Sequence, residues 1–133
     1  MTTNRNVSKE MEKVIYPQLS YSLTGILFKV HNELGQYARE KQYGDLLESY
    51  LKEACISYKR ELNLGDSGNI LDFVIDNKII LELKAVRVIT GESFRQVQNY
   101  LQQSHLKLGI LVNFRAKYLK PARVLRIDGL HHL

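Results

Sequence analysis

The sequence predicts one α/β domain with a mixed central β-sheet flanked by helices. Two observations support this class. Helical periodicity gives way to three strand-length segments in close succession, and a further helix precedes a continuous apolar run. The elements follow the order α-β-β-β-α-β, so a helical crossover joins an antiparallel meander to a buried strand. The chain of 133 residues is long enough for one core.

Two helices are expected before the first strand, because apolar residues recur there at helical spacing. The first helix covers residues 19–34, with Ser20 as its expected N-cap, and Gly35 ends it. The second helix covers residues 38–54 and carries an apolar stripe.

Three strands follow. Residues 58–64 alternate well enough to form a strand, and residues 65–69 form a turn rich in glycine and polar residues. Residues 71–86 then contain two strands joined by a tight polar turn at residues 76–78. This stretch predicts a β-hairpin.

A third helix and two more strands complete the domain. The helix covers residues 94–104. Its buried side is expected to carry Phe94, Val97 and Leu101. Residues 108–114 form a continuous apolar run, typical of a strand covered on both faces. The last strand covers residues 119–127, and Pro121 within it favours the edge of the sheet.

These elements place the domain at residues 19–127. Residues 1–18 are expected to form an N-terminal extension, in which residues 8–13 predict a short helix that Pro17 ends. Residues 128–133 are expected to form a C-terminal tail. No apolar run approaches the ~20 residues of a membrane span, so no membrane association is expected.

Charge and cysteine content narrow the function classes. The single cysteine, Cys55, excludes an internal disulfide framework and fits a reducing cytoplasm, and its place after an apolar helical pattern predicts a core residue. The net charge is +5, and residues 93–127 contain seven basic residues and no acid. Such a segment suits a polyanionic partner such as nucleic acid. Phosphate loops, dinucleotide-binding glycine motifs and CxxC pairs do not occur in the sequence.

The hairpin contains three ionisable residues, Asp72, Glu82 and Lys84, in otherwise aliphatic segments. Side chains alternate between the faces of a strand, so one continuous apolar surface requires paired residue numbers with an even sum, for example Ile75 opposite Ile79. The apolar face is then expected to carry Leu71, Phe73, Ile75, Ile79, Leu81 and Leu83. In that register Asp72 lies directly opposite Glu82, with Lys84 further along the same face.

Two explanations of this charge placement remain open. Like charges that face each other across a strand pair destabilise it, and a divalent cation between Asp72 and Glu82 would remove the repulsion. Hard cations such as Mg²⁺ prefer oxygen ligands and often use only one or two carboxylates. The alternative is a surface ion-pair cluster in which Lys84 neutralises one acid.

The spacing of Asp72 and residues 82–84 resembles the D…ExK signature of the PD-(D/E)xK nuclease superfamily, and the order of elements resembles its restriction-endonuclease-like core. More narrowly, residues 19–127 resemble the small bacterial GxxExxY proteins of that superfamily. The matching segments are Val30–Gly35, Glu40–Tyr43, Glu82–Val86, Gln96–Leu101 and Leu108–Phe114. The chain has Tyr37 where the GxxExxY family has glycine, and Leu71 where the superfamily name has proline.

The resemblance implies a metal-dependent nuclease that hydrolyses phosphodiester bonds, with DNA as the expected substrate. The expected catalytic residues are Lys84, Glu40, Asp72 and Glu82. The expected ligands of Mg²⁺ or Mn²⁺ are Asp72, Glu82, Leu83 through its carbonyl, and Glu40. The cation would activate a water, and Lys84 would orient it or stabilise the charge of the transition state. For Glu40, a solvated ion pair with Arg39 or Lys41 remains the alternative.

Four further residues are expected to bind substrate or support the site. They are Gln96, Tyr100, Tyr43 and His31. Gln96 and Tyr100 share a helix face, which the resemblance places beside the site, although Tyr100 packed on the sheet and Gln96 exposed is an equal alternative. Structural roles also remain open for Tyr43 and His31.

Two other functions remain open. One is a catalytically inactive module that binds nucleic acid or another partner on the same fold. The other is an oligomerisation or regulatory subunit, for which the sequence has no discriminating feature. The oligomeric state is not predicted, and a homodimer is among the options.

Overall fold

Three helices and a five-stranded mixed sheet make up residues 15–128, the part of the chain that the computed structural model describes. The helices are α2 (Pro17–Leu34), α3 (Glu40–Glu53) and α4 (Gly91–Ser104). The strands are β1 (Tyr58–Asn63), β2 (Ile70–Ile75), β3 (Ile79–Lys84), β4 (Leu108–Asn113) and β5 (Ala122–Leu125). The α/β class and the order of elements are therefore confirmed.

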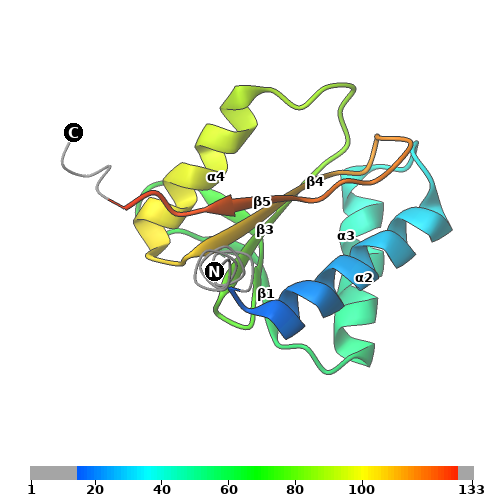
Figure 1. Ribbon diagram of the computed structural model, residues 1–133, viewed down its shortest axis with the longest axis horizontal. Helices are drawn as coiled ribbons and strands as arrows, with labels where there is room; N and C mark the ends of the chain where they lie inside the picture. Colours follow the sequence, from blue (N-terminus) through cyan, green and yellow to red (C-terminus); the bar gives the residue numbers. More distant parts are fainter. Residues whose placement is uncertain (1–14, 129–133) are drawn as a thin grey trace, which may run out of the picture.

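The strands lie in the sheet in their sequence order, β1-β2-β3-β4-β5. All neighbours are antiparallel except β3 and β4, which are parallel because α4 connects them as a crossover. Helices α2 and α3 cover one face of the sheet, and α4 covers the other (Figure 1). β3 and β4 occupy the middle of the sheet, and five of the six residues in each are buried.

The first helix begins earlier than expected, and the prediction for Ser20 is wrong. α2 starts at Pro17, because proline has no N–H to lose in the first helical turn. Ser20 is buried inside the helix, where its hydroxyl accepts a hydrogen bond from Arg123 (2.9 Å). The short helix expected at residues 8–13 and most of the expected tail lie outside the described residues. Gly35 ends α2 as predicted, with a left-handed φ of 74°.

Two expected core residues are exposed. Cys55 follows the end of α3 with a left-handed φ of 57°, and its side chain faces solvent. α4 begins at Gly91, three residues before the predicted start, and Phe94 on it is 40% exposed. Val97 and Leu101 are buried as predicted. Helical spacing identifies the apolar stripe of a helix but does not determine how wide its buried part is. Phe94 lies outside the buried part of the stripe on α4.

The register of the hairpin agrees with the register that side-chain alternation predicts. Ile75 pairs with Ile79, and Phe73 pairs with Leu81. Asp76 and Asn77 have left-handed φ values of 53° and 54°, as a tight hairpin turn requires.

The apolar face of the hairpin is not continuous. Phe73 packs between the sheet and helices α2 and α3, whereas Leu71 packs with α4 on the opposite face. The neighbouring strand changes face at the same level: Tyr58 lies with Phe73, and Leu62 lies with Leu71. Glu61, between them in β1, has a left-handed φ of 54°. This local change in the backbone interrupts the alternation of side chains between the two faces of the sheet. The prediction of one continuous apolar face assumed that this alternation extends along the whole hairpin.

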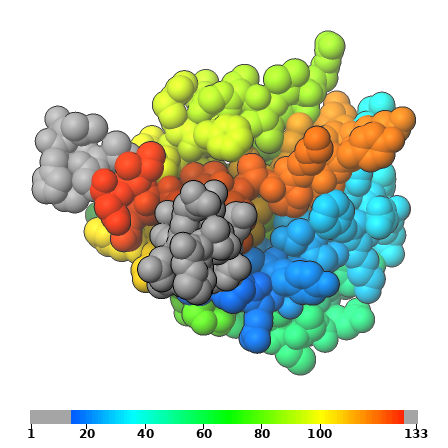
Figure 2. Space-filling view, in the orientation of Figure 1, coloured from blue at the N-terminus to red at the C-terminus, as the bar shows by residue number. Residues whose placement is uncertain are grey.

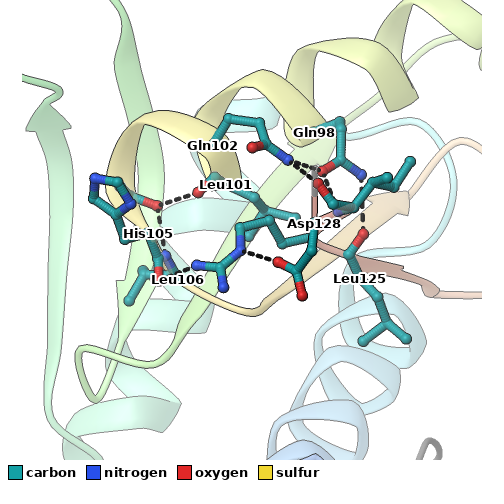
Figure 3. Close-up of polar contacts among 10 residues, drawn as sticks. Gln98, Leu101, Gln102, His105, Leu106, Leu125 and Asp128 are labelled. Atoms are coloured by element: carbon teal, nitrogen blue, oxygen red, sulfur yellow. Dashed lines mark hydrogen bonds and ion pairs between the residues drawn. The ribbon is translucent and has the colours of Figure 1, made fainter. Parts of the chain in front are cut away.

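The last strand is shorter than predicted. β5 ends at Leu125, because the backbone beyond it bonds to helix side chains (Figure 3). The N–H of Ile127 donates to Gln98 (2.8 Å), and its carbonyl accepts from Gln102 (2.7 Å). These bonds fasten α4 to the β5 edge. Within the described residues, no helix is both long and apolar enough to cross a membrane.

Gly109 permits the close packing of α4 on β4. A Cβ atom at this position would lie 2.5 Å from Cγ1 of Val97 on α4. Val97 is β-branched and fully buried, so it has little freedom to move. We expect Gly109→Ala to lower the free energy of unfolding by about 1–3 kcal/mol, measured by urea denaturation.

Gly25→Ala in α2 is the matched control, because a Cβ there would have no neighbour within 4 Å. It should raise the free energy of unfolding by about 0.5–1 kcal/mol, since alanine favours a helix interior over glycine. Equal effects of the two substitutions would contradict this account of the α4–β4 contact.

Candidate functional site

Asp72 and Glu82 lie on neighbouring strands, and the carboxylate of each accepts a backbone hydrogen bond from the other's strand. The N–H of Asp72 donates to Oε1 of Glu82 (3.0 Å), and the N–H of Leu83 donates to Oδ2 of Asp72 (2.8 Å). The two carboxylates thus take the place of backbone carbonyls at the end of the β2–β3 ladder, just beyond the pair Phe73–Leu81. Backbone bonds of this kind fix the orientation of both side chains.

The two carboxylates are shielded from water. Glu82 is only 4% exposed, and Asp72 is half-buried. Burial, together with the charge of Asp72, raises the pKa of Glu82 to about 8. Burial also raises the pKa of Asp72, and the charge of Glu40 adds to the effect. At neutral pH the metal-free pair therefore retains a proton, which relieves the repulsion between the two acids.

Lys84 ends β3 and is half-buried beside this pair. Its charge lowers the pKa of both Asp72 and Glu82, so it lies within electrostatic reach of both acids. Within residues 15–128, however, Lys84 forms no salt bridge with either carboxylate. Glu82 is buried, Asp72 is half-buried, and Lys84 has no salt bridge among the described residues, an arrangement that does not match a surface ion-pair cluster.

Glu40, the first residue of α3, reaches the same end of the sheet. Its Oε2 accepts a hydrogen bond from the N–H of Ala85 (3.3 Å), directly after Lys84. The described residues show no ion pair between Glu40 and a basic neighbour, and Lys41 pairs instead with Asp45 (3.0 Å). Glu40 also shares a pocket of ≈ 250 Å³ with Asp72 and Leu83.

The remaining residues that line this pocket were not predicted to be part of the site. They are Lys41, Gly44, Arg60, Glu61 and Phe73. Arg60 pairs with Asp45 (2.7 Å) and Glu48 (3.1 Å) of α3. No motif signals these contacts, because β1 meets α3 only through the tertiary fold.

No group of three or more His, Cys, Asp or Glu side chains converges on a common point within residues 15–128. A metal held here would therefore depend on two carboxylates, a backbone carbonyl and water. Mg²⁺ is compatible with such a set, because it keeps several waters and often uses only one or two carboxylates.

A larger groove of ≈ 920 Å³ lies on the α4 side of the sheet. Lys84, Gln96 and Tyr100 all line it, so the predicted Gln/Tyr face of α4 and the lysine border one space. Tyr100 is 4% exposed, and burial, with the charges of Glu82 and Asp72, raises its pKa. Within the described chain, neither Gln96 nor Tyr100 forms a hydrogen bond with Lys84. Their roles stay a prediction.

Tyr43 and His31 lie apart from the acids. Tyr43 is fully buried, and its hydroxyl donates to the carbonyl of Gly35 and accepts from the N–H of Ala38 (3.2 Å). Nε2 of His31 donates to the carbonyl of Ala116 (2.8 Å). Both side chains hold loops in place, and the structure does not bring either of them to Asp72 and Glu82.

Asn113 supports the strand end that carries Lys84. It pairs with Lys84 across β3 and β4, and its side-chain amide bonds both the N–H (3.1 Å) and the carbonyl (2.8 Å) of Val86. The sequence contains a signal for this role, namely a single polar residue near the end of the apolar run at residues 108–114. Such a residue lies at the carboxyl end of a parallel strand, where sites commonly form.

Comparison with known proteins identifies one family. A family model described as the PD-(D/E)XK nuclease superfamily matches residues 17–126, which extend from α2 to the end of β5. No curated protein and no solved structure matches the chain.

The raised pKa of Glu82 predicts how metal-free stability depends on pH. An unfolded glutamate loses its proton near pH 4.5, whereas folded Glu82 retains it to about 8. Between these values the folded state binds more protons, so its stability falls as pH rises. In the presence of a chelator, the free energy of unfolding should fall by at most about 1.4 kcal/mol per pH unit for this one proton.

Glu82→Gln should remove this decrease in the free energy of unfolding between pH 5 and 8, because glutamine does not titrate. Glu53→Gln, at an exposed position on α3, should leave it unchanged. The measurement is urea denaturation at several pH values. Stability that rises with pH in wild type over this range would overturn the assignment of a retained proton to the pair.

Proposed function

The chain belongs to the PD-(D/E)XK nuclease superfamily, and we propose on that premise that it is a metal-dependent nuclease acting on DNA. The superfamily suggests a nuclease-like function and implies nucleic-acid binding. The observation that carries the proposal is the buried pair of Asp72 and Glu82, bonded to each other's strands with Lys84 beside it. We further propose that the chain is one of the GxxExxY proteins, in which Tyr37 replaces the glycine.

Nucleases of this superfamily generally use divalent metal ions, and the residues here fit one. Two like charges buried side by side require compensation, which a retained proton supplies in the metal-free protein. A divalent cation would supply this compensation instead, with Asp72, Glu82 and the Leu83 carbonyl as its oxygen ligands and Glu40 reaching it through a bound water. Mg²⁺ or Mn²⁺ is the proposed ion.

Each residue of the site has a separate task in this proposal. A bound divalent cation supplies polarisation of a phosphate oxygen and a more acidic water. Asp72 and Glu82 are held rigidly by backbone N–H groups, so they present their oxygens in one orientation. Lys84 carries a positive charge on the groove side, where it would stabilise the negative charge that develops on the phosphate. Gln96 and Tyr100 would contact the substrate strand in the same groove.

The first test is cleavage of single- and double-stranded DNA and RNA in Mg²⁺ or Mn²⁺. Lys84→Ala and Asp72→Asn should each reduce the rate by about 10²-fold or more, because each removes charge stabilisation from the reacting phosphate. Lys78→Ala and Asp76→Asn are matched controls, since both residues lie in the turn at the other end of the same hairpin. Undiminished cleavage by the two site variants would refute the assignment, and binding without cleavage in wild type would identify an inactive binding module.

The second test measures metal binding without activity. Mn²⁺ at 100 times its dissociation constant should raise the free energy of unfolding of wild type by about 2.7 kcal/mol. Asp72→Asn should lose most of this gain, and Asp76→Asn should keep it. Equal stabilisation of all three proteins would place the metal elsewhere.

A further inference from the structure

Two tyrosines beside the site are almost fully exposed. Tyr37 is 80% exposed in the turn between α2 and α3, and Tyr118 is 73% exposed in the loop between β4 and β5. Each ring lies near a cation: the guanidinium of Arg115 is 5.6 Å from the centre of Tyr37, and Nζ of Lys117 is 5.5 Å from the centre of Tyr118. We call these four residues the aromatic–cationic ledge.

The backbone of the ledge is held in place from both sides. Nε of Arg115 donates to the carbonyl of Gln36 (3.0 Å), and the amide of Gln36 donates to the carbonyl of Arg115 (3.0 Å). His31 bonds the next carbonyl, that of Ala116. The α2–α3 turn and the β4–β5 loop are 79 residues apart in sequence, yet these bonds join them into one unit (Figure 1). A surface whose backbone is already fixed binds with a smaller loss of conformational entropy.

The ledge adjoins the strand end that carries the candidate catalytic residues. Tyr37 lies three residues before Glu40, in the turn that leads into α3, and Glu40 accepts a hydrogen bond from the N–H of Ala85 just beyond Lys84. On the other side, the N–H of Phe114 donates to the carbonyl of Lys84 (2.9 Å), and Arg115 follows directly. The ledge therefore lies at the same end of the sheet as Lys84 and Glu40. In the space-filling view the two segments of the ledge form one continuous surface (Figure 2).

The charge of this region suits a polyanion. Residues 35–41 and 113–120 contain five basic residues and one acid, Glu40. The basic residues are Arg39, Lys41, Arg115, Lys117 and Lys120. Basic side chains between exposed aromatic rings are the surface that single-stranded nucleic acid uses: cations follow the phosphates, and unpaired bases stack on the rings.

We propose that the aromatic–cationic ledge binds unpaired bases of single-stranded nucleic acid next to the cleavage site. In a duplex the base faces are already stacked on one another and do not reach a tyrosine ring, so the ledge favours single strands, overhangs or flaps. The inference rests on the proposed nuclease function for its biological meaning, but strand binding itself does not require a metal or turnover.

The experiment measures binding by fluorescence anisotropy, with the full chain in a chelator so that no cleavage occurs. The probes are labelled oligothymidylate, oligouridylate and a DNA duplex of equal length. Tyr37→Ala and Tyr118→Ala should each weaken binding of the single strands by about 5- to 100-fold. Duplex binding should change less than about 2-fold, because it depends on phosphate contacts alone.

Two control variants separate stacking from other effects. Tyr37→Phe keeps the ring and should bind single strands like wild type. Tyr21→Ala removes a tyrosine that is 84% exposed near the start of α2 and should also leave binding unchanged. All four variants are substitutions at exposed positions, and circular dichroism checks that each is folded. Comparison of the affinities for oligothymidylate and oligouridylate decides whether the ledge binds DNA or RNA more tightly.

The outcomes distinguish this inference from the proposed function. Wild type that prefers duplex, or ledge variants that bind single strands as tightly as Tyr21→Ala, would overturn the ledge. Ledge-dependent single-strand binding in a protein that cleaves nothing in Mn²⁺ would support the ledge and refute the nuclease. Cleavage of duplex DNA by wild type, together with unchanged single-strand binding by Tyr37→Ala and Tyr118→Ala, would support the nuclease and refute the ledge.

Discussion

The site depends on one constraint, the partial or full burial of two carboxylates on adjacent strands of the same sheet. Unpaired charges in a protein interior cost several kcal/mol, so the surrounding backbone must stabilise them. Here the N–H groups of Asp72 and Leu83 bond the acids across the strand pair, and the pair retains a proton when no cation is present. The register of β2 and β3 is therefore coupled to the chemistry of the site, since a slip of one residue would place the acids on opposite faces.

Open spaces near this pair lie on both faces of the sheet. Glu61 in β1 adopts a left-handed backbone conformation at the level of Asp72, and both strands change the face on which they pack. As a result, Asp72 opens into a pocket beside α3, whereas Lys84 borders the groove beside α4. Acids from the strands, a glutamate from α3 and polar side chains of α4 therefore lie around one end of the sheet, on both of its faces.

The elements around the strand end are fastened to it by polar contacts that link distant parts of the sequence. Asn113 holds the backbone that follows Lys84, and Gln36 and Arg115 join the turn before α3 to the loop after β4. On the far side, Gln98 and Gln102 of α4 hold the chain that follows β5 (Figure 3). A binding surface built on such braced loops is preorganised for its ligand.

The sequence alone determined the class of fold and the hairpin register from Ile79 back to Phe73, because side-chain alternation in strands is a local property. It also predicted that Asp72 and Glu82 lie close together, although the alternation on which that prediction relied ends at Phe73. It did not determine where Leu71 packs, since the change of face depends on the conformation of Glu61 in a neighbouring strand. Nor did it identify the pocket lining from β1, the exposed position of Cys55 or the joined loops of the ledge. These features arise from contacts between segments far apart in sequence, and only the tertiary structure brings those segments together.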